Sequence, residues 1–201
     1  LLYFSKFDEQ IQENMKIHRF YIEILLKDKR EVEIKDPQLI NQWKNVLRFE
    51  EGEKIILFDN SGSDFLFFIK EITDKRVRLV LIEEKRVDSK NPYALHIIPA
   101  LIKRDMFELV LQKITELGVE KILPLLAERS IKNTLNLERS KSIVKEAAEQ
   151  SGKVRIPEIV APEKLEVIIQ NREEDRFYIA LDPRGEKFSK KLLFPSLTRS
   201  A

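Results

Sequence analysis

The sequence of 201 residues is 43% hydrophobic and 35% charged, a balance typical of a globular chain with one large or two small domains. Its formal net charge of +2 excludes nucleic-acid binding through a global positive field, so any such binding requires a local basic patch. The absence of cysteine excludes disulfides, thiol catalysis and cysteine-based zinc sites, and two histidines leave little for another metal centre.

The N-terminal residues show no targeting feature. No apolar run reaches the length of a membrane span, and the first residues lack the basic start of a signal peptide. We therefore expect a cytoplasmic protein. The first methionine is Met15, and a strand-like pattern begins directly after it. Residues 1–14 are expected to be a non-native or disordered leader without function.

Residues 15–84 show a pattern of short strands around one helix. The strands are predicted at 17–22, 31–34, 54–58, 65–72 and 76–82. Asp36 and Pro37 form a cap and first-turn pair for the helix. Its inward side chains are expected to be Leu39, Ile40, Trp43, Val46 and Leu47. A hairpin turn is predicted at 59–62, and the whole pattern indicates a small β-barrel.

Residues 85–93 are charged and end near an Asn-Pro pair, which predicts a linker. From residue 94 onward, strands alternate with helices, and this alternation predicts a parallel sheet. The strands are expected at 95–101, 121–126 and 177–181, and the later helices at 137–151 and 163–171. The helix at 137–151 is expected to turn Ile143, Val144, Ala147 and Ala148 inward and to end at Gly152.

The helix between the first two of these strands has a predicted start, face and end. Asp105 is expected to cap it, with Glu108 completing a capping box. Gly118 is expected to end it, with the apolar Val119 directly after. The stripe that packs on the sheet is predicted as Met106, Leu109, Val110, the stem of Lys113, Ile114 and Leu117.

Polar residues gather at the ends of these elements, where open α/β sheets bind ligands. They are Lys103, Arg104, Lys113, Glu116, Glu128 and Arg129. The run QKITELGVEKILPLLAERS at 112–130, followed by EAAEQSGKVRIPEI at 146–159, resembles the RsmE family, ribosomal RNA small subunit methyltransferase E, of the SPOUT class. The resemblance extends over roughly residues 16–184.

The resemblance implies a two-domain fold. The first part, 15–84, would be a PUA-like β-barrel that touches RNA, giving an α+β domain. The second part, 94–201, would be the N-terminal portion of an α/β SPOUT methyltransferase domain of the trefoil-knot class. The family continues with a Gly-Pro-Glu-Gly-Gly loop and a Leu-Gly-x-Arg-Ile-Leu-Arg-x-Glu-Thr segment that complete the knot. Neither occurs in the sequence, so we expect a fragment that is inactive by itself.

The resemblance also implies an activity. Members use S-adenosyl-L-methionine to methylate N3 of a uridine in 16S rRNA, the family's target being uracil 1498. SPOUT sites are usually completed across a homodimer, so two subunits are expected. Two alternatives stay open. One is a non-catalytic RNA-binding module. The other is a different SPOUT RNA methyltransferase, because the run at 181–185 also resembles the RlmH family.

The matched motifs supply candidate site residues. Arg19 and Arg48 match RNA-facing positions of the N-terminal domain, where guanidinium groups pair with phosphates. The remaining basic candidates are expected to form one positive rim that steers an RNA loop, with ordinary surface charges as the alternative. They are Lys103, Arg129, Lys153 and Arg155. The first cofactor loop is represented by Leu181, Asp182, Pro183 and Arg184.

Three further polar residues lie in the matched motifs, namely Glu116, Glu149 and Gln150. Either glutamate could orient a base or bind a partner subunit, whereas Glu116 could also form only a helix-end salt bridge. No residue is assigned as a general base. The acidity of uracil N3 is close enough to neutral for positioning and charge stabilisation to suffice.

Overall fold

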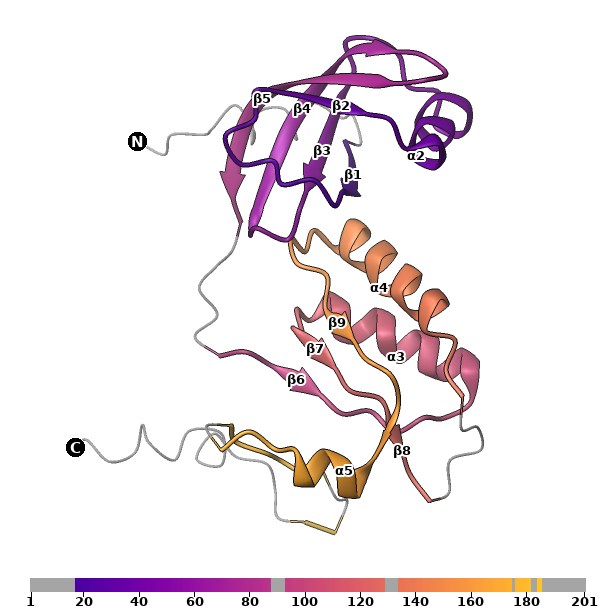
Figure 1. Ribbon diagram of the computed structural model, residues 1–201, viewed down its shortest axis with the longest axis vertical. Helices are drawn as coiled ribbons and strands as arrows, with labels where there is room; N and C mark the ends of the chain where they lie inside the picture. The colour runs from indigo at the N-terminus through magenta and orange to yellow at the C-terminus, as the bar shows by residue number, and fades with distance from the viewer. Residues whose placement is uncertain (1–16, 88–92, 129–133, 175, 182–183, 186–201) are drawn as a thin grey trace, which may run out of the picture. The chain divides into compact units, whose positions relative to one another are not determined.

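The computed structural model describes residues 17–87, 93–128, 134–174, 176–181 and 184–185 (Figure 1). The chain divides into two compact units, Leu1–Leu165 and Glu166–Ala201, and each is described by itself. Both predicted domains contribute to the first unit. No helix of the described residues is long and apolar enough to cross a membrane.

The first unit begins with a five-stranded sheet, called here the N-terminal domain (residues 17–87). Its strands are β1 (His18–Tyr21), β2 (Glu31–Ile34), β3 (Lys54–Phe58), β4 (Ser63–Ile72) and β5 (Val77–Arg86). Their order is β1-β3-β4-β5-β2, with β1 parallel to β3 and the other pairs antiparallel. All five predicted strands are confirmed. β5 continues to Arg86, two residues beyond the predicted end of the domain.

The helical segment of this domain begins as α2 (Pro37–Asn41) and widens into the π-helical turn η1 (Gln42–Val46). Asp36 caps it as predicted, because its carboxylate accepts a hydrogen bond from the backbone N–H of Gln38 at 2.8 Å. The expectation that Val46 points inward was wrong, since its side chain is 67% exposed. The wider turn changes the angular step per residue and rotates this position away from the sheet.

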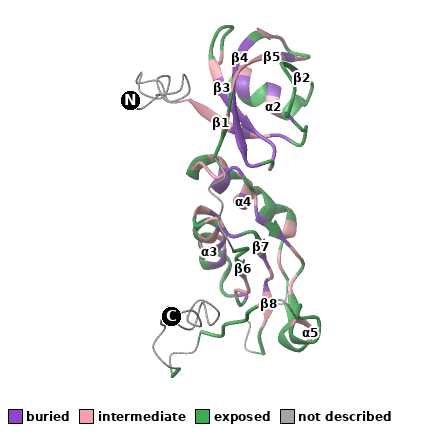
Figure 2. Cartoon of the chain, turned by 90° about the vertical axis from the view of Figure 1, so that its left-hand side faces the viewer, coloured by how far each residue is buried: buried purple, intermediate pink, exposed green. Residues whose placement is uncertain are grey.

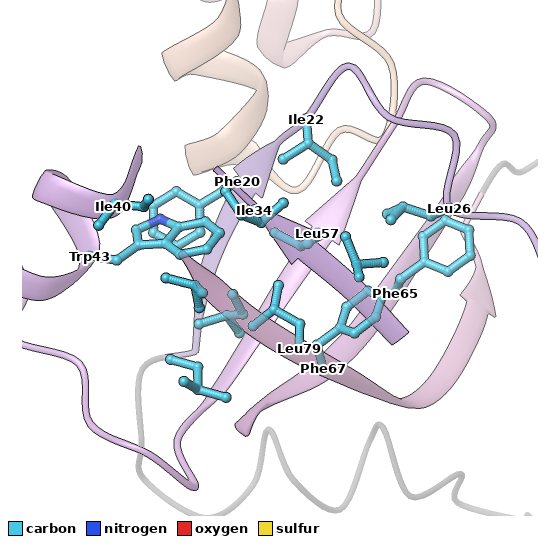
Figure 3. Close-up of a cluster of buried hydrophobic side chains, with 14 residues drawn as sticks. Phe20, Ile22, Leu26, Ile34, Ile40, Trp43, Leu57, Phe65, Phe67 and Leu79 are labelled. Atoms are coloured by element: carbon cyan, nitrogen blue, oxygen red, sulfur yellow. The ribbon is translucent and has the colours of Figure 1, made fainter. Parts of the chain in front are cut away.

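The core of the N-terminal domain is rich in aromatic side chains (Figure 3). Phe65 and Phe67 alternate along β4 and pack with Phe20 and with Trp43, whose ring centroid is 5.1 Å from that of Phe20. Burying each side chain of this size contributes roughly 1.5–3 kcal/mol. Figure 2 shows the buried residues of these strands in purple. The domain therefore has a hydrophobic core of its own.

The remainder of the first unit is an α/β arrangement. Its elements are β6 (His96–Ile97), α3 (Arg104–Glu116), β7 (Lys121–Ile122), β8 (Leu125–Leu126), α4 (Leu137–Ser151), β9 (Glu158–Ile159) and β10 (Glu163–Lys164). β6, β7 and β9 form a parallel sheet in that order, which confirms the predicted parallel topology. The strand predicted at 121–126 is divided into β7 and β8, since Pro124 has no N–H for a sheet ladder.

α3 differs from its prediction in start and face. Arg104 is already helical, so Lys103 occupies the cap position without a side-chain hydrogen bond and the predicted Asp105 cap was wrong. The predicted stripe was wrong in part: Met106 and Leu109 are 52% and 44% exposed, whereas Ile114 packs against the core as expected. The buried side chains are Phe107, Leu111 and Thr115.

Thr115 explains the wrong assignment of the α3 face. Its side chain is polar, yet the residue is only 1% exposed. The hydroxyl donates a hydrogen bond to the carbonyl oxygen of Leu111 at 2.8 Å, so its burial leaves no donor unsatisfied. The end of α3 is as predicted. Gly118 has φ +84°, and the Val119 N–H donates to the carbonyl of Ile114 at 3.3 Å.

α4 matches its prediction. Asn136 caps it by accepting a hydrogen bond from the backbone N–H of Arg139, and Gly152 ends it with φ +75°. Val144, Ala147 and Ala148 are buried and Ile143 is half-buried. The helix packs on α3 and its last turns also contact β1. α4 thus connects the parallel sheet with the N-terminal domain.

The second unit begins within α5 (Leu165–Gln170), which confirms a short helix in the predicted 163–171 region. The buried strand predicted at 177–181 was wrong. Phe177, Tyr178, Ile179 and Leu181 are exposed, and none of them lies in a strand. A strand needs a hydrogen-bonded neighbour, and no described segment pairs with this one.

Candidate nucleic-acid interface

A cleft of about 210 Å³ lies at the carboxyl ends of the parallel strands, between the first turns of α3 and α4. Apolar walls come from Leu101, Phe107 and Leu135. The polar lining comprises Arg104, Glu108, Thr134, Asn136, Arg139 and Ser140. The carboxyl edge is where open α/β sheets place their ligands, so this cleft is the first candidate site.

Three charged side chains on the cleft wall form one network. Glu108 accepts hydrogen bonds from Arg104 at 2.9 Å and from Arg139 at 2.6 and 2.7 Å. The hydrogen bonds from Arg139, followed by those from Arg104, lower the pKa of Glu108 to about 2. The carboxylate is therefore ionised at neutral pH and does not act as a proton donor. The network carries one net positive charge.

Lys103 is exposed at the cap position of α3, on the same carboxyl edge as the cleft. Its predicted partner Arg129 lies outside the described residues. Glu128, the residue before it, is exposed after β8. Sequence reasoning placed Lys103 at the correct edge of the sheet, but it did not single out Arg139. The available signal was that Arg139 follows the Asn136 cap by three residues, which puts it in the first turn of α4.

Lys153 and Arg155 lie at the other end of α4. They follow its last residue and precede β9, so they are at the amino ends of the parallel strands. The 15 residues of α4 span about 22 Å at 1.5 Å per residue. The length of α4 thus separates them from Lys103, and the single positive rim stays a prediction. Arg155 instead donates a hydrogen bond to the carbonyl oxygen of Asn60 at 3.1 Å.

Arg19 is largely buried, since its side chain is only 11% exposed. Its guanidinium forms an ion pair with Asp64 at 2.5 Å and donates to the carbonyl oxygens of Ala148 at 3.2 Å and Glu149 at 3.4 Å. It also lies 4.9 Å from the centroid of the Phe58 ring. This placement corrects the prediction of an RNA contact by Arg19, because these donors are directed into the protein.

Arg48 is exposed, in keeping with its predicted RNA-facing position. It follows η1 with φ +58°, a conformation uncommon for a residue other than glycine. Within the described part of the chain it forms no hydrogen bond or ion pair. The loop between β1 and β2 adds the exposed Lys27, Lys29 and Arg30, which sequence reasoning missed. The sequence feature that could have identified them is the run of basic residues around Asp28.

The three acidic and amide candidates do not converge. Glu149 accepts a hydrogen bond from the backbone N–H of Tyr21 at 3.0 Å, and burial raises the pKa of its carboxyl. Glu116 pairs with Lys113 at 2.9 Å near the end of α3, which fits its alternative role in a helix-end salt bridge. Gln150 is exposed. None of these three residues is assigned as a general base, and the catalytic residue stays open.

The predicted cofactor residues are only partly described. Leu181 is 85% exposed and Arg184 is exposed, whereas Asp182 and Pro183 lie outside the described residues. In the part of the chain that the structure describes, no three histidine or acidic side chains gather in a way that could hold a metal ion.

The family model described as an RNA methyltransferase domain matches residues 89–199, and that of an RNA methyltransferase PUA domain matches residues 44–82. A PUA-like domain followed by a parallel α/β sheet with a basic cleft defines a class of RNA-modifying proteins. Within this class, the chain belongs to the RNA methyltransferase family that includes ribosomal RNA small subunit methyltransferase E. The resemblance and the PUA-like and SPOUT-type fold class expected from the sequence are confirmed.

Individual relatives agree. Ribosomal RNA small subunit methyltransferase E of Rickettsia conorii is 31% identical over 146 residues, covering 71% of this chain and 58% of the relative. The Bacillus subtilis protein of the same name is 28% identical over 150 residues, covering 71% and 59%. The chain therefore spans slightly less than three fifths of these curated relatives.

Solved structures show the same likeness. The crystal structure of ribosomal RNA small subunit methyltransferase E from Neisseria gonorrhoeae bound to S-adenosyl methionine has a TM-score of 0.71 at 27% identity, covering 79% of this chain and 67% of that one. A putative methyltransferase from Legionella pneumophila, in complex with the same cofactor, has a TM-score of 0.70 at 27% identity, covering 80% and 69%.

Proposed function

We propose that this protein is an S-adenosyl-L-methionine-dependent methyltransferase of 16S ribosomal RNA. The observation that carries the proposal is the structural likeness to the Neisseria gonorrhoeae enzyme over 79% of the chain. Support also comes from the two matching domain families, which together reach from the N-terminal domain into the parallel sheet. We assign the protein to the cytoplasm, where ribosomal RNA is the substrate.

The proposed target atom is N3 of a uracil, uracil 1498 in the family. Bound S-adenosyl-L-methionine supplies an electrophilic methyl group, and uracil N3 must lose its proton before it attacks. No residue is assigned as a general base. Leu181 and Arg184 are exposed, and no step through the cofactor is assigned to them. The contribution of this part of the chain is to bind and orient the RNA.

The RNA-binding surface is proposed to comprise exposed cations on both domains. Arg48 and the loop cations Lys27, Lys29 and Arg30 belong to the N-terminal domain. Lys103 and Arg139 belong to the cleft at the carboxyl edge. Contacts between such cations and phosphates release counterions, so affinity must fall steeply as salt concentration rises.

The exposed side of α3 supports a homodimer. Met106, Leu109 and Leu117 repeat at helical spacing and are 52%, 44% and 76% exposed. Apolar side chains in such a row indicate a surface that another subunit covers. A second copy of the chain is a suitable partner, because a symmetric dimer brings the same apolar surface of both subunits together.

A second candidate function is RNA binding without methyl transfer. The exposed cations Lys27, Lys29, Arg30 and Arg48 favour it, because such side chains can contact phosphates without a bound cofactor. Calorimetric titration with S-adenosylhomocysteine separates the two functions. A micromolar dissociation constant supports the methyltransferase, whereas RNA binding without cofactor binding supports the second candidate.

The methyltransferase proposal is tested with small ribosomal subunits from cells that lack the modification. The purified protein is incubated with these subunits and tritiated S-adenosyl-L-methionine, and the labelled nucleotide is identified by mass spectrometry. Label in 3-methyluridine supports the proposal down to the target atom. Label in another nucleotide, or in large-subunit RNA only, contradicts it.

A further inference from the structure

The N-terminal domain contacts the C-terminal end of α4 through a small set of polar residues, called here the α4 junction. It comprises Arg19, Asp64, Ala148 and Glu149, together with the backbone of Tyr21. These residues come from β1, β4 and the last turns of α4. None of the RNA contacts proposed above uses them.

Arg19 links the two sides of the α4 junction. Its Nη2 binds Asp64 of its own domain, and its Nη1 donates to the carbonyl oxygens of Ala148 and Glu149. The Ala148 carbonyl also accepts from the backbone N–H groups of Gly152 and Lys153, whereas carbonyls of the last helical turn, such as that of Glu149, lack an i+4 partner within the helix. A cation at this end of α4 also interacts favourably with the helix dipole. The planar fork of arginine can serve both sides at once, which the ammonium group of lysine cannot do.

Glu149 adds a second link in the opposite direction. Its Oε1 accepts a hydrogen bond from the backbone N–H of Tyr21 at 3.0 Å. A third link lies in the turn between β3 and β4. There the carbonyl oxygen of Asn60 accepts from Arg155, and its Oδ1 accepts from the N–H of Ile156 at 2.9 Å. Contacts at three separate points fix an orientation as well as a distance.

The charges at the α4 junction are buried. The side chains of Arg19 and Asp64 are 11% and 9% exposed. Burial raises the pKa of the Asp64 carboxyl, although its hydrogen bond with Arg19 acts in the opposite direction. A buried ion pair adds little net stability compared with apolar side chains of the same size, because desolvation offsets the attraction. What such a pair adds is one defined geometry.

We propose that Arg19 is a positioning residue that, together with Glu149, fixes the N-terminal domain on the end of α4 at a set distance from the cleft. The cleft lies at the other end of the helix, about 22 Å away at 1.5 Å per residue. The substrate class that uses this arrangement is a folded RNA long enough to contact both places. This inference rests on the proposed RNA methyltransferase activity.

The first test measures the position of the N-terminal domain without RNA or cofactor. Because the sequence contains no cysteine, Lys75→Cys and Ser142→Cys introduce two exposed labelling sites, one on the N-terminal domain and one on α4. Single-molecule energy transfer between the labels should give one narrow distance distribution. Arg19→Ala should broaden it or add a second population, and Arg19→Lys should give an intermediate result.

The matched control is Arg78→Ala. Arg78 pairs with Glu33 and Glu71 inside the N-terminal domain, so its loss removes ion pairs of similar type without touching the α4 junction. Glu149→Ala is the second variant, because it leaves the Arg19–Asp64 pair intact and removes only the contact with Tyr21. An unchanged narrow distribution in both Arg19→Ala and Glu149→Ala overturns the proposal, and so does equal broadening in Arg78→Ala.

The second test compares two RNA probes. A tetranucleotide that is stacked as in a helical strand spans about 14 Å at 3.4 Å per nucleotide, which is less than the length of α4. A hairpin from small-subunit RNA with a stem longer than about 22 Å can reach both. Glu149→Ala should weaken hairpin binding about tenfold and tetranucleotide binding less than about twofold, because rigidly linked contacts act together. Equal losses for both probes contradict a positioning role.

The two tests separate this inference from the proposed function. If the unmodified protein binds no RNA, the proposed function fails, yet the distance measurement still decides whether Arg19 and Glu149 fix the domain. If the protein methylates small-subunit RNA and the variants keep a narrow distance distribution, the function stands and the positioning role is refuted.

Discussion

Arg139 and Glu108 join the first turns of α4 and α3 through two nearly parallel hydrogen bonds, at 2.6 and 2.7 Å. Fork-to-fork pairing of this kind fixes both distance and angle. The pair closes one wall of the cleft, and Arg104 shares the same carboxylate. The double pairing across this wall of the cleft therefore requires an ionised Glu108.

The first prediction concerns acid. The lowered pKa of Glu108, about 2 against an ordinary 4.5, gives a contribution to stability that is present above pH 4.5 and lost as the pH falls towards 2. Glu108→Gln removes it at every pH. The difference in Tm between Glu108→Gln and the unmodified protein should shrink between these pH values in scanning calorimetry. Glu138→Gln, an exposed pair partner of Lys141, is the control and should show little change. A Glu108→Gln difference independent of pH contradicts the prediction.

The second prediction has the opposite sign. Burial raises the pKa of Glu149, so the folded protein binds protons more tightly than the unfolded chain and stability falls as the pH rises from about 4.5 through the folded value. Glu149→Gln keeps a neutral acceptor for the Tyr21 N–H. Its Tm at pH 7 should be equal or higher by roughly 1–3 °C, and the gain should vanish below pH 4.5. A lower Tm at pH 7 would show that the ionised carboxylate itself is required.

The third prediction concerns the buried face of α3. Leu111 is fully buried whereas Leu109 is 44% exposed, so the two leucines form a matched pair on one helix. Leu111→Ala should lower the free energy of unfolding by about 2–5 kcal/mol. Leu109→Ala should lower it by less than about 1 kcal/mol when measured in the monomeric Leu117→Glu variant, where no second subunit covers this side chain. Urea titration measures both free energies of unfolding. Similar losses would support the buried face that was predicted from the sequence.

The α3 face shows why sequence reasoning reached some parts of the fold and missed others. Element types and most boundaries follow from periodicity, caps and glycines, as Asn136 and Gly152 show for α4. The face of α3 did not, because apolar residues lie on its exposed side, at Met106 and Leu109, as well as on its buried side. Thr115 looks polar in sequence and is buried only because its hydroxyl bonds to the preceding turn.

The candidate site was predicted less well than the fold, for a related reason. A single sequence indicates that a basic residue follows a strand or a helix, but not what surrounds its side chain. Arg19 and Arg48 are alike in sequence, yet one forms a buried ion pair with Asp64 and the other is exposed after η1. Long-range partners such as Asp64, 45 residues away from Arg19, decide between the two outcomes.

The fourth prediction tests the homodimer. Of the exposed residues Met106, Leu109 and Leu117, Leu117 is the most exposed, at 76%, and it does not belong to the hydrophobic core. If α3 faces a second subunit, Leu117→Glu should shift the protein from dimer to monomer in sedimentation velocity, because a buried carboxylate without a partner is strongly unfavourable. Circular dichroism should stay unchanged. Ser142→Glu on the exposed side of α4 changes the charge by the same amount, so it is the matched control and should leave the dimer intact.

The fifth prediction concerns Arg48 and its exposed guanidinium. If Arg48 binds a phosphate, Arg48→Ala should weaken binding of small-subunit RNA at low salt and reduce the slope of log affinity against log salt by about 1. Lys75→Ala removes an equally exposed cation from the turn between β4 and β5 and should leave the slope unchanged. Fluorescence anisotropy at several salt concentrations measures both slopes. Equal slopes for the two variants would show that Arg48 does not contact a phosphate, because such a contact must release a counterion.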